Sequence, residues 1–132
     1  MKAILRITPR PISHDAENLL KEAFGEDIEI KTVNRSISDN DPMKVIYEEI
    51  EEQEKNSYKV VAIEPAVVMK DSYGIIINEL NIPILSPVYD HEKGTGMPIV
   101  IGRDAEGRET FKISHYEIIE GIKTELITRP LK

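Results

Sequence analysis

Two hydrophobic periods alternate along the first ninety residues. Short apolar runs, typical of strands, occupy residues 3–7, 28–33, 58–63 and 82–88. Between them, apolar residues recur at the three-to-four-residue spacing of an amphipathic helix. Four such alternations in this length favour right-handed crossovers and parallel strands. We therefore expect an α/β fold with a Rossmann-like, mostly parallel sheet and helices on its faces.

The expected helices have recognisable boundaries. Ser13 is a suitable N-cap for the first, and Gly25 suits the residue just beyond its end. Asp41 caps the second, and a third is expected between residues 66 and 80. Residues 28–33 alternate apolar with charged side chains, which indicates a strand half-open to solvent near the sheet edge.

The last third of the chain has a different pattern. Residues 98–101 and 110–114 flank a turn and predict a hairpin, followed by more β-prone sequence. Residues 114–117 fit both a helix capping box and a further strand, and the sequence leaves both open. We expect one α/β domain over residues 1–132, with βα alternation to residue 90 and a β-rich extension of antiparallel strands after it.

Composition narrows the class of protein. A chain of 132 residues with 40% apolar and 31% charged residues suits one folded globular domain. The absence of cysteine excludes disulfides and thiolate metal sites, in agreement with a reducing compartment. The first apolar run is too short for a signal peptide or a membrane span. A cytoplasmic protein without membrane association is expected.

The net charge of the chain limits the kinds of molecule that it is expected to bind. The formal net charge of −7 argues against general DNA or RNA binding, which depends on clustered lysine and arginine. A local site for an anion stays compatible with this charge. The glutamates of residues 48–54 fit either a solvated helix face or an acidic binding surface.

Candidate site residues gather where strands end. Open parallel sheets bind ligands beyond the carboxyl ends of their strands. If the first and third strands are neighbours, the loops that follow them face one crevice. The candidates there are Thr8, Arg10, Ser13 and His14 after the first strand, Glu64 and Pro65 after the third, Ser86 after the fourth, and Lys70 near the third helix.

Each of these side chains has a functional and a structural interpretation. Arg10 offers forked donors for a phosphate, or else extends into solvent. Ser13 either caps its helix or, with the helix N-terminus, helps to hold an anion. His14 fits an acid–base group or an ordinary surface residue. Glu64 ends a buried strand, where a carboxylate has either a function or a structural partner.

Several familiar motifs are missing from the sequence. The sequence has no P-loop frame, so the 93–96 loop indicates a flexible hairpin or gate loop rather than a phosphate cradle. No Gly-x-Gly-x-x-Gly follows the first strand, which disfavours a standard dinucleotide site. The histidines at 14, 91 and 115 are far apart, which disfavours a metal site. No cofactor is expected.

Four segments carry a family resemblance: residues 5–13, 61–66, 96–101 and 116–119. In this order the chain resembles the small Rossmann-like CRISPR-associated proteins of antiviral defence. Those proteins bind, and in some families cleave, cyclic oligoadenylate second messengers. The resemblance implies a ring-nuclease-like phosphodiesterase that binds its nucleotide as a homodimer, because a symmetric ring is naturally held across a two-fold axis.

The resemblance also implies roles for individual residues. Arg10 would stabilise the phosphate and Ser13 would position it, while His14 or Glu64 would transfer protons in a cleavage that needs no metal. Two alternatives remain open. One is a nucleotide sensor without turnover, and the other is a protein-interaction or assembly module.

Overall fold

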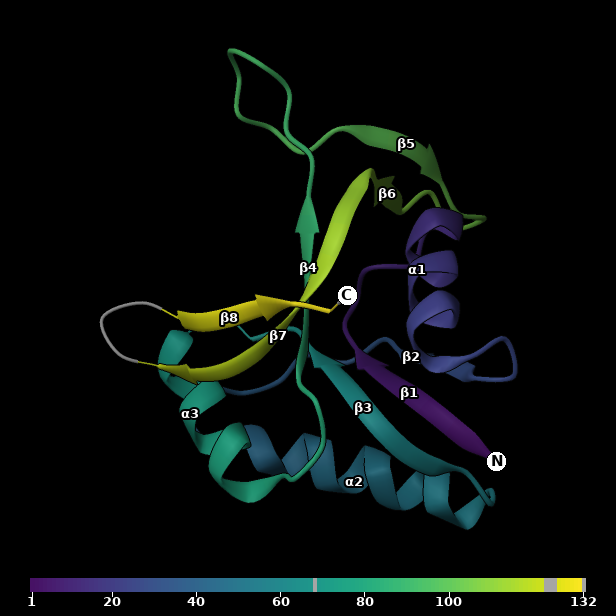
Figure 1. Cartoon of the computed structure of the whole chain (residues 1–132), viewed down its shortest axis with the longest axis vertical. Helices are drawn as coiled ribbons and strands as arrows, with labels where there is room; N and C mark the ends of the chain where they lie inside the picture. Colours follow the sequence, from purple (N-terminus) through teal and green to yellow (C-terminus); the bar gives the residue numbers. More distant parts are fainter. Residues whose placement is uncertain (68, 123–125, 132) are drawn as a thin grey trace.

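Three parallel strands form the first sheet. The computed structural model describes residues 1–67, 69–122 and 126–131, apart from the side chains of residues 70, 122 and 126 (Figure 1). Strands β1 (Lys2–Ile7), β2 (Glu29–Val33) and β3 (Lys59–Pro65) lie in the order β2-β1-β3. Both pairings are parallel, which confirms the expected parallel strands and the neighbouring positions of the first and third.

Helices cover both faces of this sheet. They are α1 (His14–Phe24), α2 (Pro42–Lys55) and α3 (Lys70–Glu79). The Ser13 hydroxyl accepts a hydrogen bond from the Ala16 N–H, as expected for the α1 cap.

No helix in the described part of the chain is long and apolar enough to cross a membrane.

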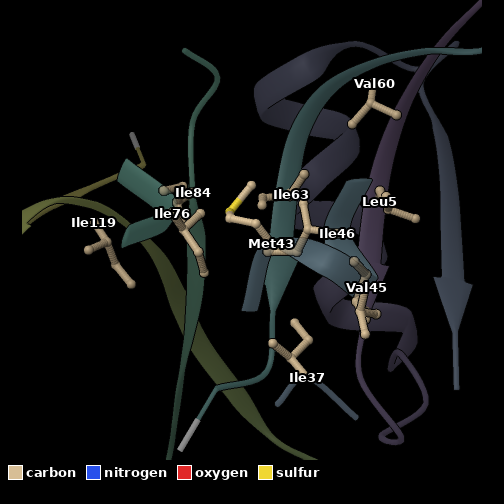
Figure 2. Close-up of a cluster of buried hydrophobic side chains, with 11 residues drawn as sticks. Leu5, Ile37, Met43, Val45, Ile46, Val60, Ile63, Ile76, Ile84 and Ile119 are labelled. Atoms are coloured by element: carbon tan, nitrogen blue, oxygen red, sulfur yellow. The ribbon is translucent and has the colours of Figure 1, made fainter. Parts of the chain in front are cut away.

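Two hydrophobic clusters pack against opposite faces of the sheet. Because side chains alternate along a strand, Ile4 and Leu5 of β1 point to different sides. Ile4 packs with Leu20 of α1, whereas Leu5 packs with Ile46 of α2 and Ile63 of β3. Figure 2 shows the cluster that contains Leu5. Burial on both faces explains the nearly continuous apolar runs of β1 and β3.

The second sheet is antiparallel and comes mostly from the tail. Strands β4 (Leu85–Tyr89), β7 (Ile113–Ile122) and β8 (Leu126–Pro130) lie in the order β4-β7-β8. Residues 114–117 therefore belong to a strand, and of the two interpretations of this segment the helical one is wrong.

The two sheets meet at a narrow backbone junction. The expected fourth parallel strand makes one parallel bridge to the first sheet, between Ile63 and Ile84, where the Pro83 carbonyl accepts the Ile63 N–H at 3.0 Å. Pro83 has no N–H with which to extend this ladder. From Leu85 onward β4 pairs with β7 instead.

A short hairpin completes the fold. Strands β5 (Val100–Arg103) and β6 (Glu109–Phe111) are antiparallel, which confirms the predicted hairpin. The preceding loop closes through a bridge between His91 and Pro98. In Figure 1, the hairpin lies beyond the end of β4.

Candidate functional site

A hollow of about 240 Å³ lies beyond the carboxyl ends of β1 and β3. The loops after these two parallel neighbours face each other across it, as their adjacency predicts. Tyr73 of α3 and Tyr89 of β4 form further walls. The lining residues are Thr8, Pro9, Arg10, Glu64, Pro65, Ala66, Val67, Tyr73, Pro87 and Tyr89.

A buried ion pair includes the glutamate of this hollow. Arg6 and Glu64 are opposite one another in the β1–β3 register, and their residues are only 1% and 4% exposed. Arg6 Nε donates to Glu64 Oε1 at 3.0 Å, and Arg6 Nη2 donates to Oε2 at 3.2 Å. Burial lowers the pKa of Arg6, but the Glu64 carboxylate outweighs it, so the pKa lies above its ordinary value.

Two hydroxyl groups complete the network. The Tyr116 hydroxyl of β7 donates to Glu64 Oε1 at 2.8 Å, and Arg6 Nη1 donates to Thr32 Oγ1 at 2.9 Å. In the described residues, every buried side-chain nitrogen and oxygen has a hydrogen-bond partner. Glu64 therefore has the structural partners that a buried carboxylate requires.

Two tyrosines next to this carboxylate stay neutral. Burial, and then the charge of Glu64, raises the pKa of both Tyr73 and Tyr89. The Ser86 side chain near Tyr73 and the Arg10 guanidinium near Tyr89 partly oppose these increases in pKa. At physiological pH both phenols are thus available as neutral donors on the wall of the hollow.

Arg10 lies at the exposed rim of the hollow. Its guanidinium carbon is 5.1 Å from the ring centroid of Tyr89 and 4.6 Å from that of Phe111, within cation–π range. Its backbone N–H donates to Thr8 Oγ1 at 3.1 Å. The side chain is therefore held over two aromatic rings rather than extended freely into solvent.

The structure separates the predicted site residues into two groups. Thr8, Arg10, Glu64 and Pro65 line the hollow together. Ser13 caps α1, His14 is exposed at the start of that helix, and Ser86 belongs to β4 but does not line the hollow. Neither Ser13 nor His14 belongs to the lining of the hollow. Lys70 begins α3, and its side chain lies outside the described residues.

Sequence reasoning missed the partners of Glu64. A signal for Arg6 was present, because a charged residue in the middle of a doubly buried strand needs an opposite charge nearby. Tyr116 lies in the segment for which the sequence allowed both a helix and a strand, so its contact with Glu64 could not be predicted.

Another hollow, of about 590 Å³, opens at the opposite end of the sheet, near Met1, Ile50 and Ile82. It is larger, but no charged residue that lines it is buried. The smaller hollow is the stronger candidate because it combines a buried carboxylate, two phenols and a guanidinium. No cluster of three or more potential metal ligands occurs among residues 1–67, 69–122 and 126–131.

Comparison of the chain with protein-family models, curated proteins and solved structures gives no match. A functional assignment therefore depends on the chemistry of the hollow itself.

Proposed function

We propose that the hollow at the carboxyl edge of β1 and β3 binds an anionic nucleotide, in the manner of a Rossmann-like nucleotide-binding protein. The observation that carries the proposal is the position of Arg10, whose guanidinium lies at the rim of a hollow walled by Tyr73 and Tyr89. The guanidinium offers charge-assisted hydrogen bonds to a phosphate, and the tyrosines offer aromatic surface and neutral donors to a base.

The size of the hollow agrees with a small ligand. Its volume of about 240 Å³ is slightly below the roughly 300–1,000 Å³ typical of sites for drug-sized molecules. Such a volume suits one nucleotide unit. Local charge at Arg10 can hold this unit even though the whole chain is acidic, because solvent and salt screen distant charges.

Cyclic oligoadenylate is the specific ligand that we propose, on the basis of the family resemblance. A ring with rotational symmetry would present equivalent units to two copies of the chain, so the proposed assembly is a homodimer. Edge strands in the antiparallel part of the tail are a further reason to propose self-association, because an edge strand can pair with another chain. The corresponding role is CRISPR-associated antiviral defence in the cytoplasm.

Binding without turnover is the form of the proposal that the contacts favour. Glu64 already accepts three hydrogen bonds, and His14 lies outside the lining of the hollow. A proton-transfer role for either residue therefore requires a change of contacts on binding. Arg10 is the observation in favour of cleavage, because a guanidinium stabilises charge on a phosphate under attack.

The proposed cleavage is an attack of the ribose on its own phosphate, which consumes no metal and no water. The ribose 2′-oxygen attacks the adjacent phosphorus and its proton passes to a base. The bond from phosphorus to the 5′-oxygen breaks, and that oxygen receives a proton. The products are a 2′,3′-cyclic phosphate and a free 5′-hydroxyl group.

Titration calorimetry with AMP and with linear and cyclic oligoadenylates tests the proposal. Arg10→Ala should weaken binding by about 1.5–3 kcal/mol, the range for hydrogen bonds to charged groups, or about 10- to 150-fold. The matched control is Arg129→Ala, which removes an exposed arginine of β8 that pairs with Glu120. Equal affinities of the parent and Arg10→Ala, or no binding of any of these nucleotides, would contradict the proposal.

A parallel assay separates the sensor from the nuclease. The parent is incubated with cyclic oligoadenylate without divalent metal, and the products are separated by chromatography. Retained ligand without product supports the sensor. A cyclic phosphate product that disappears in His14→Ala or Glu64→Gln, with binding retained, supports cleavage. Light scattering at micromolar concentration checks the dimer.

A further inference from the structure

A second hollow adjoins the first at the loop after β1. It is a shallow depression of about 360 Å³, open to solvent, between this loop and the β5–β6 hairpin. Pro9 and Arg10 line both hollows. The remaining lining residues of the second are Pro11, Arg103, Gly107, Arg108, Glu109 and Phe111.

An aromatic pair marks the boundary between the two hollows. Tyr89 lines the first and Phe111 lines the second. Their ring centroids are 5.9 Å apart in an edge-to-face arrangement, and the Arg10 guanidinium lies over both rings. One cationic group is thus shared by two adjoining spaces, each with its own aromatic side chain.

We infer that the two hollows form one site for a ligand with two nucleotide units, whose linking phosphate lies at Arg10. The inference rests on the proposed function, since it assigns the first unit to the hollow beside Tyr73. The second unit would lie between the loop after β1 and the hairpin. Arginine stacks on aromatic rings and also binds phosphate through its forked N–H donors, so Arg10 suits the linking phosphate of such a ligand.

The wall of the second hollow is fixed by Arg108. Its Nε is 2.7 Å from Asp104 Oδ2, and its Nη1 donates to the Pro9 carbonyl at 3.2 Å. This bond ties the hairpin to the loop after β1, residues that are 99 positions apart. The positive charge of Arg108 is largely neutralised by Asp104, so this side chain serves to hold the wall.

Arg103 is the cation better placed to reach a ligand. Its side chain is 61% exposed, and its contact with Glu109 measures 3.7 Å, a length typical of a weak surface pair. It also donates to the Gly107 carbonyl at 3.2 Å. Reorienting this side chain toward a second phosphate or base therefore breaks only weak contacts.

The test compares AMP with a linear adenine dinucleotide that carries a 5′-phosphate, using calorimetry on the full chain. Stacking of one more base contributes about 1–3 kcal/mol, so the dinucleotide should bind about 5- to 150-fold more tightly than AMP. Arg103→Gln should remove the part of this gain that depends on the Arg103 charge, and it should leave the AMP affinity unchanged. Lys112→Gln is the control, because it removes one positive charge beside the hairpin and lines neither hollow.

The outcomes distinguish the two proposals. If AMP binds and the dinucleotide binds no more tightly, the second subsite is wrong and the proposed function stands. If neither nucleotide binds, both are wrong. If Arg103→Gln and Lys112→Gln reduce the dinucleotide affinity equally, the gain reflects general charge and the second subsite is again overturned.

Discussion

Arg6 and Tyr116 donate to the same oxygen of Glu64, at 3.0 and 2.8 Å, from two different sheets. Arg6 belongs to the central parallel strand β1, and Tyr116 belongs to β7 of the antiparallel sheet. The carboxylate between them is thus a buried polar connection between the two sheets. Its removal should affect stability as well as any ligand that enters the hollow.

Replacing Glu64 with glutamine should destabilise the protein strongly. The substitution keeps the shape of the side chain but leaves the buried Arg6 guanidinium without its counter-charge. Loss of one partner of a buried pair typically costs about 3–5 kcal/mol. The free energy of unfolding is measured by urea denaturation, with Glu52→Gln on the exposed part of α2 as the control. A loss below about 1 kcal/mol, within the range of exposed pairs, would contradict this expectation.

Tyr116→Phe should remove one hydrogen bond with almost no change of volume. Because the acceptor is charged, the expected loss is about 1.5–3 kcal/mol in the free energy of unfolding. Tyr58→Phe at the opposite end of the sheet provides the control. Equal stabilities of the two variants would show that the Tyr116 hydroxyl contributes nothing specific.

Stability should fall as the pH rises past about 10, the ordinary pKa of tyrosine. Burial and Glu64 raise the pKa values of Tyr73, Tyr89 and Tyr116 in the folded chain. Above that pH the unfolded chain loses phenolic protons that the folded chain retains, so the unfolded state is favoured. The stabilising contribution is complete below the unfolded pKa and is lost as the pH rises toward the folded values. Urea denaturation over this alkaline range should show a smaller decline for Tyr116→Phe, and an equal decline would count against the assignment.

Asp39→Ala should loosen the start of α3. The N-cap residue Met69 makes no side-chain cap, and Asp39 Oδ1 accepts hydrogen bonds from Ser72 Oγ at 2.7 Å and from the Met69 N–H at 3.3 Å. Loss of a cap costs about 0.5–2 kcal/mol. Hydrogen exchange should become faster in the first turn of α3, and Asp39→Asn should preserve most of the protection. Unchanged exchange in Asp39→Ala would rule out this capping role.

The first ninety residues showed how far local pattern extends. The periods of β1, α1, β2, α2 and β3, together with caps such as Ser13, followed from the sequence because each depends on residues close in the chain. The pairing of β4 did not follow. β4 pairs with β7, whose residues lie about thirty positions further along the chain. Whether β4 pairs with β3 or with β7 cannot be inferred from the residues near β4.

The candidate site was predictable to the same extent. Arg10 and Glu64 came from the rule that parallel strand ends converge, and that rule needs only strand order. Phe111 and Tyr116 approach from the tail, through contacts that only the finished fold creates. The role of Arg108 depends likewise on a contact with Pro9 across 99 positions.

The bridge between Ile63 and Ile84 has a consequence for the order of folding. Because this single bridge is the backbone pairing that joins the two sheets in the described part of the chain, their joint stability depends on side-chain contacts. One of these contacts is the hydrogen bond from Tyr116 to Glu64, which spans 52 positions. Contacts this distant in sequence close late, because a long loop must first lose its freedom. A partly folded chain with only the parallel sheet would carry a Glu64 carboxylate lacking one donor. We expect this lost hydrogen bond to disfavour the intermediate, so that the two sheets unfold together in one all-or-none transition.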